Sequence, residues 1–209
     1  MITVHHLNES RSQRILWLLE ELRLPYEIRF YWRDKHTKMG PPELQQVHPL
    51  GKSPIVTDDG RAIAESGAII DYIVRHYGEG RLRPDPATAA FDDYMYWLHY
   101  AEGSASLPFV IDPIARSFGK MAMPLQRRVD HERALNLGYI DSCLGQKDYL
   151  LGDELTAADI QMSFVGELAA AFPDVSDFPR LQAWVSRFQS RPAYRAAIAK
   201  GGPYRYART

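Results

Sequence analysis

Every strand signal in this chain lies before the segment GEGRLRPDP at residues 78–86. Upstream of it, ITVHHL and YEIRF read as strands, and PIV and RAIA flank the turn DDG at 58–60, which is typical of a β-hairpin. Downstream, only helical periodicity remains. Because Gly and Pro interrupt regular structure, we interpret the segment as a linker. The pattern predicts a first domain at 1–78, a linker at 79–87 and a second domain at 88–209.

The first domain alternates strands and helices. Apolar residues at Ile15, Leu18, Leu19 and Leu22 follow the i, i+3, i+4, i+7 spacing of a helix face, and a second such face covers 69–77. The order β-α-β, α, β-β-α predicts a small mixed sheet with helices on its faces.

The second domain shows no strand pattern. Its helical stretches are predicted at 89–104, 124–144, 157–172, 181–191 and 193–199. We therefore expect an α/β domain followed by an all-α domain.

Composition excludes several classes of protein. The net charge of -1 argues against a general affinity for nucleic acid or acidic membranes, and we interpret Arg127-Arg128 and Arg205…Arg208 as solvated surface. The single Cys143 excludes an internal disulfide, a Cys-x-x-Cys pair and a thiolate metal cluster, so we expect no metal. With no signal-peptide pattern and no stretch of roughly 18 apolar residues, we expect a cytoplasmic protein.

The Ser53-Pro54 bond stands at the entrance of a strand. Proline lacks the N–H group that a central strand needs, so it belongs at a strand start or an edge. A cis bond here turns the chain sharply and exposes the backbone N–H and C=O of Ser53, which can pair with an extended peptide. A trans proline that merely begins the strand is the alternative, and most X-Pro bonds are trans.

Ser66 stands where an apolar helix begins. A free helix N-terminus attracts a carboxylate, which the serine hydroxyl can also bind; the alternative is a serine that simply caps the helix. The adjacent Glu65 can pair with an ammonium group. A carboxylate and an ammonium on one carbon describe the end of an amino acid.

Ser10 lies between the first strand and the first helix, among the polar residues Asn8, Arg11 and Ser12. A hydroxyl here can donate to an anion held against the helix start. Because no His/Asp pair stands out beside it, we do not expect a hydrolase.

Four segments together carry a resemblance to a known family. NESRSQRILWLLEEL, HPLGKSPIV, AESGAIIDYI and LTAADI, in this order and spacing, resemble the glutathione S-transferases over nearly the whole chain. The resemblance implies a thioredoxin-like N-terminal domain, an all-helical C-terminal domain and a homodimer, in which each N-terminal domain usually pairs with the partner's helical domain.

The resemblance also assigns roles to individual residues. It implies that the Ser53-Pro54 bond is cis and that Ser53 pairs through its backbone with the cysteinyl part of glutathione. Glu65 and Ser66 match the pair that holds the γ-glutamyl end, and Lys52 matches a lysine near the glycyl carboxylate. Ser10 matches the serine-type catalytic position, while Asn8, Arg11 and Ser12 remain alternatives.

The second substrate of the family binds beside the sulfur, between the domains. Tyr96, Tyr100 and Ser104 fall at helical spacing in a stretch that resembles its lining, although core packing is the alternative for the aromatic residues. Thr156 and Asp159 resemble the family's helix cap, which is structural.

The expected function is that of a cytoplasmic detoxification enzyme, a transferase that ionises the thiol of its co-substrate glutathione for attack on a small, mostly apolar electrophile. Two alternatives remain open at this point. One is a glutathione-dependent peroxidase or disulfide reductase. The other is a non-enzymatic binding module that keeps the fold.

Overall fold

The computed structural model describes residues 1–207, with the side chains at 173 and 174 excepted. By its internal contacts the chain divides into two compact units. The first contains Met1–Asp85 together with the segment from Phe188 onward, and the second contains Pro86–Arg187.

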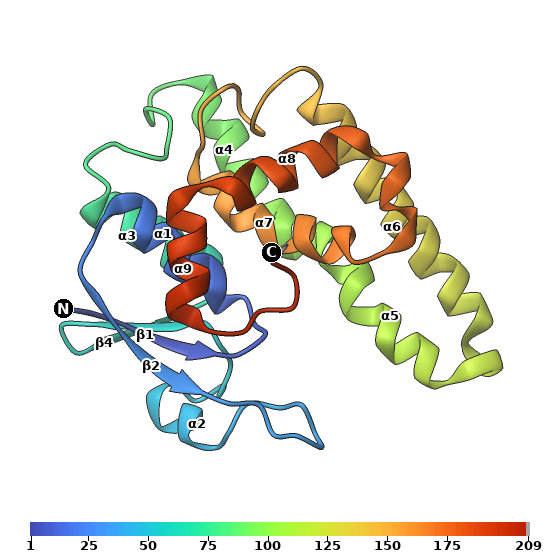
Figure 1. Ribbon diagram of the computed structural model, residues 1–209, viewed down its shortest axis with the longest axis horizontal. Helices are drawn as coiled ribbons and strands as arrows, with labels where there is room; N and C mark the ends of the chain where they lie inside the picture. The colour runs from blue at the N-terminus through green and yellow to red at the C-terminus, as the bar shows by residue number, and fades with distance from the viewer. Residues whose placement is uncertain (208–209) are drawn as a thin grey trace. The chain divides into compact units, whose positions relative to one another are not determined.

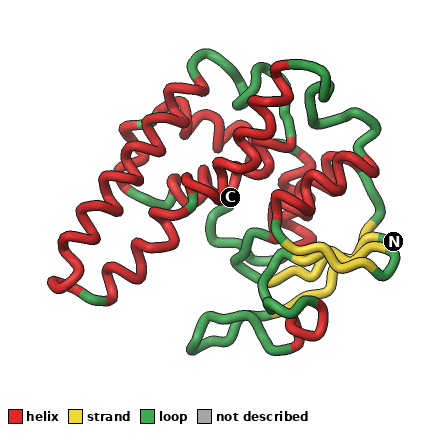
Figure 2. The backbone as a smooth tube through the Cα atoms, turned by 180° about the vertical axis from the view of Figure 1, so that it is seen from behind, coloured by secondary structure: helices red, strands yellow, loops and turns green. Residues whose placement is uncertain are grey.

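A single mixed sheet forms the centre of the first unit (Figure 2). Its strands in the described part of the chain are β1 (Ile2–Leu7), β2 (Tyr26–Tyr31), β3 (Ile55–Asp58) and β4 (Arg61–Ala64), in the spatial order β2-β1-β3-β4. Strands β1 and β2 are parallel, whereas β3 is antiparallel to both β1 and β4. This is the predicted β-α-β unit followed by a hairpin.

Helices α1 (Ser12–Leu22) and α3 (Ser66–Tyr77) pack together and bury their apolar faces. Ile15, Leu18 and Leu19 of α1 are fully buried, as the spacing predicts. The short helix α2 (Glu43–Val47) contributes Leu44 to a separate cluster with Leu7, Tyr31 and Ile55.

Helix α9 (Pro192–Gly201) lies beside α1 (Figure 1), far from it in the sequence. The indole of Trp17 stacks on Phe188 at 5.4 Å and meets Tyr194 edge-on at 5.5 Å. Arg191 adds an ion pair to Glu21, with 2.6 Å between Nε and Oε1. The end of the chain thus completes the core of the first unit.

The second unit is helical in all of its regular segments except an isolated β-bridge between Tyr149 and Gly152. Its helices are α4 (Ala89–Tyr100), α5 (Leu107–Ser117), α6 (Met123–Leu144) and α7 (Ala157–Ala170), followed by α8 (Pro179–Ser190), which runs across the division at Phe188. The prediction of an α/β domain followed by an all-α domain is confirmed.

One helix was not predicted. The helix expected at 89–104 ends as an α-helix at Tyr100, continues as a π-helical turn at Ala101–Ala105, and is followed by α5. Helix α5 has Pro108 in its first turn, where proline is tolerated, and Pro113 inside it, where proline opposes a helix. Packing against α6 stabilises it nevertheless (Figure 1).

The predicted cap of α7 is present. Thr156 and Asp159 form the reciprocal capping box, in which Asp159 Oδ2 accepts from the backbone N–H of Thr156 at 3.0 Å. The same buried carboxylate also accepts from the N–H of Leu150 at 2.9 Å and from Nε1 of Trp184 at 3.0 Å. The motif therefore joins three segments of the second unit.

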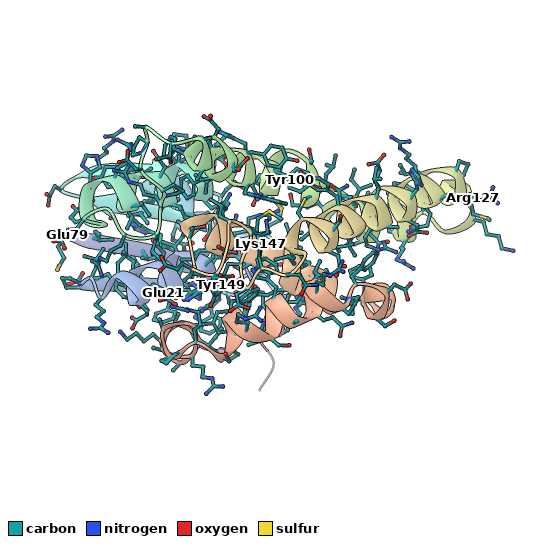
Figure 3. All side chains as sticks on the ribbon, turned by 90° about the horizontal axis from the view of Figure 1, so that it is seen from above. Glu21, Glu79, Tyr100, Arg127, Lys147 and Tyr149 are labelled. Atoms are coloured by element: carbon teal, nitrogen blue, oxygen red, sulfur yellow. The ribbon has the colours of Figure 1, made fainter. Side chains whose placement is uncertain are left out.

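Two surface features complete the description. Arg127 is exposed on α6 (Figure 3), as expected of solvated surface, whereas Arg128 pairs with Glu132 one turn later and both of these line the cavity described below. Within residues 1–207, no helix combines the length and the apolar character that crossing a membrane requires.

Candidate functional site

The turn between β1 and α1 is held by Arg33. Its backbone N–H donates to Asn8 Oδ1 at 2.8 Å, and its guanidinium donates to the carbonyls of Asn8 and Glu9 at 3.1 and 3.2 Å. Glu9 has a φ of 54°, a left-handed conformation that is uncommon outside glycine. The turn is therefore a defined structure, and the side chain of Asn8 is committed to it.

Ser10 and Ser12 follow this turn at the start of α1. Their hydroxyl oxygens lie 2.7 Å apart, and Ser10 Oγ also accepts from the backbone N–H of Ser12 at 3.2 Å. Ser12 is fully enclosed, and its hydroxyl contacts Nδ1 of His6 at 2.9 Å. Arg11, between the two serines, is half-buried and makes no side-chain cap on α1.

The Ser53-Pro54 peptide bond is cis, as the resemblance implied. The hydroxyl of Ser53 donates to the carbonyl of His5 at 3.1 Å and lies 3.4 Å from Ser10 Oγ. Among residues 1–207, no hydrogen-bond partner is found for the backbone N–H or C=O of Ser53. These two groups are what an added extended peptide would need.

Ser66 is the first residue of α3 and is buried. Nη2 of Arg14, a buried residue of α1, donates to Ser66 Oγ. Because Oγ accepts this bond, the hydroxyl proton of Ser66 points elsewhere, and no acceptor for it is found in the described part of the chain. A carboxylate at the start of α3 would meet that proton and a nearby positive charge.

Lys52 and Glu65 flank these groups and are both exposed. Glu65 precedes α3 with a φ of 67°, so the chain enters the helix through an uncommon backbone conformation. Neither side chain has a polar contact within residues 1–207.

The fold therefore brings together three segments of the first unit. Ser10 and Ser53 meet directly, and the start of α3 joins α1 through the bond between Arg14 and Ser66. Lys52 and Glu65 are sequence neighbours of these groups, and within residues 1–207 their side chains make no polar contact with them. In the described part of the chain, no group of His, Cys, Asp or Glu side chains is arranged to hold a metal ion.

Two residues of this region had no predicted role. Arg14 lies in the predicted helix that carries Ile15, and His6 lies in the predicted strand ITVHHL. His6 is buried, and its Nε2 lies 3.1 Å from the carbonyl oxygen of Gly201. Burial lowers the pKa of its imidazole to about 4, against the opposing effect of that hydrogen bond. His6 is therefore neutral at physiological pH.

The second unit contains a cavity of about 620 Å³. Tyr96, Tyr100 and Ser104 all line it, and so do residues of α5 and α6. The ring of Tyr100, which is labelled in Figure 3, stacks on that of Tyr96 at 5.4 Å, and the Tyr100 hydroxyl donates to Asn136 Oδ1 at 2.5 Å. The cavity has aromatic and aliphatic walls with a few polar groups, as small-molecule sites do.

Comparison with known protein families gives two matches. Residues 10–76 match the model of the glutathione S-transferase N-terminal domain, and residues 106–192 match that of the glutathione S-transferase C-terminal domain. Together they include the site of the first unit and most of the cavity lining.

Individual relatives match over nearly the whole chain. The chain is 36% identical to glutathione S-transferase 3 of Schizosaccharomyces pombe, covering 96% of this chain and 88% of the relative. It is 32% identical to glutathione S-transferase 1 of Saccharomyces cerevisiae, covering 96% and 95%. A crystal structure of a glutathione S-transferase from Actinobacillus pleuropneumoniae is 31% identical and superposes with a TM-score of 0.90, covering 100% of this chain and 97% of the other.

Proposed function

Because the chain belongs to the glutathione S-transferase family and is a transferase with glutathione as its co-substrate, we propose that it ionises the glutathione thiol at Ser10. The resulting thiolate attacks a small, mostly apolar electrophile. No covalent intermediate with the protein and no metal take part.

One observation carries this proposal. Ser10 Oγ lies 3.4 Å from Ser53 Oγ, and the backbone N–H and C=O of Ser53, beside a cis proline, have no partner within residues 1–207. A cysteinyl residue that pairs with this backbone as an added strand places its thiol within reach of Ser10. Of the alternatives, Asn8 is committed to Arg33 and Ser12 is fully enclosed, which favours Ser10.

The remaining residues bind the ends of the tripeptide in this proposal. The γ-glutamyl carboxylate accepts from the hydroxyl of Ser66, which Arg14 supports, while Glu65 pairs with the ammonium group. The exposed Lys52 approaches the glycyl carboxylate. These contacts orient the ligand and do not touch the sulfur.

The energy required is modest. A free thiol has a pKa of about 8.5, and lowering it by about 2 units takes about 2.7 kcal/mol of preferential binding to the anion. A hydrogen bond to a charged acceptor contributes about 1.5–3 kcal/mol, and a helix N-terminus adds about 0.3–1 kcal/mol. Ser10 and the start of α1 together supply an amount of this size.

The electrophile binds in the cavity lined by Tyr96, Tyr100 and Ser104 in this proposal. Its aromatic walls favour a planar apolar group, and the Tyr100 and Asn136 side chains offer a polar contact. Tyr100→Phe, which keeps the ring, is the mildest test, because it should raise KM for the electrophile without changing that for glutathione.

We also propose a cytoplasmic homodimer. Leu107, Val110 and Ile114 of α5 and Phe118 at its C-cap are between 47% and 61% exposed and repeat at helical spacing. A stripe of large apolar side chains on a helix surface is typical of an association surface. The single Cys143 accords with a reducing compartment.

The test combines binding with activity. Calorimetry should show that the folded protein binds glutathione, and assays with aryl halides, peroxides and disulfides should show turnover with the aryl halides. Turnover only with peroxides or disulfides would replace conjugation by reduction. Binding without any turnover would indicate a binding module, and absence of binding would reject the proposed site.

A further inference from the structure

A continuous chain of hydrogen bonds joins Ser10 to the end of α9. Ser10 Oγ lies 2.7 Å from Ser12 Oγ, Ser12 Oγ lies 2.9 Å from His6 Nδ1, and His6 Nε2 lies 3.1 Å from the carbonyl oxygen of Gly201. All three side chains are buried. Among the four residues of this series of hydrogen bonds, His6 alone has an ionisable side chain in the physiological pH range. It has no part in the mechanism given above.

The carbonyl of Gly201 determines which group donates and which accepts in each hydrogen bond of this series. A carbonyl only accepts, so Nε2 of His6 carries a proton, and Nδ1 of the neutral imidazole is an acceptor. Ser12 therefore donates to Nδ1, which is nearer than its other acceptor, the Leu7 carbonyl at 3.3 Å. Ser12 Oγ then accepts from Ser10, whose proton points inward.

With this direction Ser10 offers a ligand only lone pairs, which suits a thiol but not a thiolate. To donate to a thiolate, Ser10 must turn its proton outward, Ser12 must donate to Ser10, and Nδ1 of His6 must carry a proton of its own. Every donor and acceptor is then satisfied again. The series of hydrogen bonds thus has two arrangements in which every donor has an acceptor, and they differ by one proton on His6.

We propose that His6 is a positioning residue for Ser10, and that ionisation of the thiol and protonation of His6 favour each other. The proton balance is complete without another reactant. The S–H proton passes to Ser10 Oγ, the Ser10 proton to Ser12 Oγ and the Ser12 proton to Nδ1 of His6, so a thiolate and an imidazolium result. The inference rests on the proposed function of Ser10.

The surroundings of His6 support this role. The elements packed against it present uncharged groups: Ser12 from α1, the Gly201 carbonyl from α9, and the Phe30 ring from β2, which meets the imidazole edge-on at 5.7 Å. No charged side chain contributes to the lowered pKa of His6 among the described residues; burial causes it. The free protein therefore keeps His6 neutral, and an anion at Ser10 supplies the missing attraction for a proton.

Nuclear magnetic resonance of the histidine ring nitrogens tests the proposal on the full chain. The free protein should show His6 as the Nε2–H tautomer. The pKa of His6 should be about one unit or more higher with glutathione sulfonate, whose sulfonate stays charged in the pH range where His6 titrates, than with S-methylglutathione, whose sulfur is uncharged there. Equal values with the two ligands, or an Nδ1–H tautomer in the free protein, would overturn the inference.

Two variants test whether the series of hydrogen bonds carries the effect on the pKa of His6. Ser12→Ala interrupts the series of hydrogen bonds and should abolish the difference in the pKa of His6 between the two ligand complexes. His5→Gln is the control, because His5 bonds to Tyr31 and Thr57 and lies outside the chain, so the His6 difference should persist. If Ser12→Ala fails to fold, the comparison of ligands in the unaltered protein still decides.

The two proposals fail separately. If glutathione binds and its thiol pKa responds to Ser10→Ala, while His6 does not respond to the thiolate, only the coupling is wrong. If Ser10→Ala leaves the pKa of the glutathione thiol unchanged, the proposed function of Ser10 fails, and this inference fails with it.

Discussion

Arg14 donates through Nη2 to the hydroxyl oxygen of Ser66, so the first turns of α1 and α3 are joined by a buried cation and a serine. A buried arginine is stabilised by groups that compensate its charge, because desolvation of a charge is unfavourable. In the proposed site, the γ-glutamyl carboxylate of glutathione adds a negative charge beside the bond between Arg14 and Ser66.

Ser66→Ala should therefore weaken glutathione binding more than it slows the chemical step. The γ-glutamyl end is several bonds from the sulfur, so its contacts are similar in the ground state and the transition state. We expect KM for glutathione to rise by about tenfold, equivalent to about 1.4 kcal/mol, with kcat changed by less than about twofold. Steady-state kinetics over a range of glutathione concentrations measure both.

Arg14→Gln should act in the same direction, and Arg75→Gln serves as its control. Arg75 lies on α3 but is half exposed and pairs with Asp71. Removal of either arginine changes the net charge equally. An equal rise in KM for both variants would show a general effect of charge and would contradict the role of Arg14.

Ser10→Ala should raise the pKa of bound glutathione by about one unit or more, because the hydroxyl binds the thiolate better than the thiol. The rate at neutral pH should fall by about tenfold and recover partly as the pH rises. Titration of the thiolate's ultraviolet absorbance measures this pKa. Asn8→Ala, Arg11→Ala and Ser12→Ala complete the series, and a larger shift in one of them would transfer the role.

The stability of the fold should depend on pH through His6. Its pKa is lowered to about 4 in the folded protein, from about 6.5 in the unfolded chain. Between these values the unfolded chain binds more protons, so stability is present above about pH 6.5 and is lost as the pH falls toward 4. The contribution is on the order of 3 kcal/mol. Urea unfolding at several pH values should show a flatter profile for His6→Gln than for the unaltered protein.

Asp159→Ala should destabilise the second unit more than Thr156→Ala does. Loss of the Thr156 cap costs about 1 kcal/mol. Loss of Asp159 also leaves the buried N–H groups of Leu150 and Trp184 without their acceptor, so we expect about 3 kcal/mol or more. Urea denaturation measures both. Activity per folded molecule should be unchanged, and a large loss of activity with unchanged stability would place the pair in the site.

The apolar stripe on α5 predicts the oligomeric state. Val110→Glu should convert the proposed dimer into a monomer, which light scattering detects, because burying an unpaired carboxylate is unfavourable. Ser142→Glu is the control, at an exposed serine of α6 that lies off α5. A monomer before any substitution would reject the dimer. A dimer that survives Val110→Glu would place its interface elsewhere.

The order of the elements was predictable because each one has a local cause. The hairpin has its turn at 58–60, α1 and α3 have apolar faces, and α7 has its capping box. Helix α5 was missed because Pro113 opposes a helix locally, and the contact of α5 with α6 outweighs that effect.

The site was predictable only in part. The motif around Ser53 and Pro54 is local, so a resemblance identified it. The role of His6 depends on Gly201, which is distant in the sequence and meets it only when α9 packs against α1. No periodicity in the sequence indicates such a meeting. The same holds for Arg14 and Ser66, whose contact requires two helices to be placed side by side.

The packing of α9 on α1 also orders events during synthesis. Trp17 emerges from the ribosome early, whereas Phe188 and Tyr194, the rings it packs against, are translated only after all of Pro86–Arg187. At about 5–20 residues per second, the face of α1 that carries Trp17 stays uncovered for several seconds or more. The nascent chain therefore exposes a large aromatic surface that a chaperone can bind. The first unit, which carries the proposed glutathione site, is complete only after α9 has been translated.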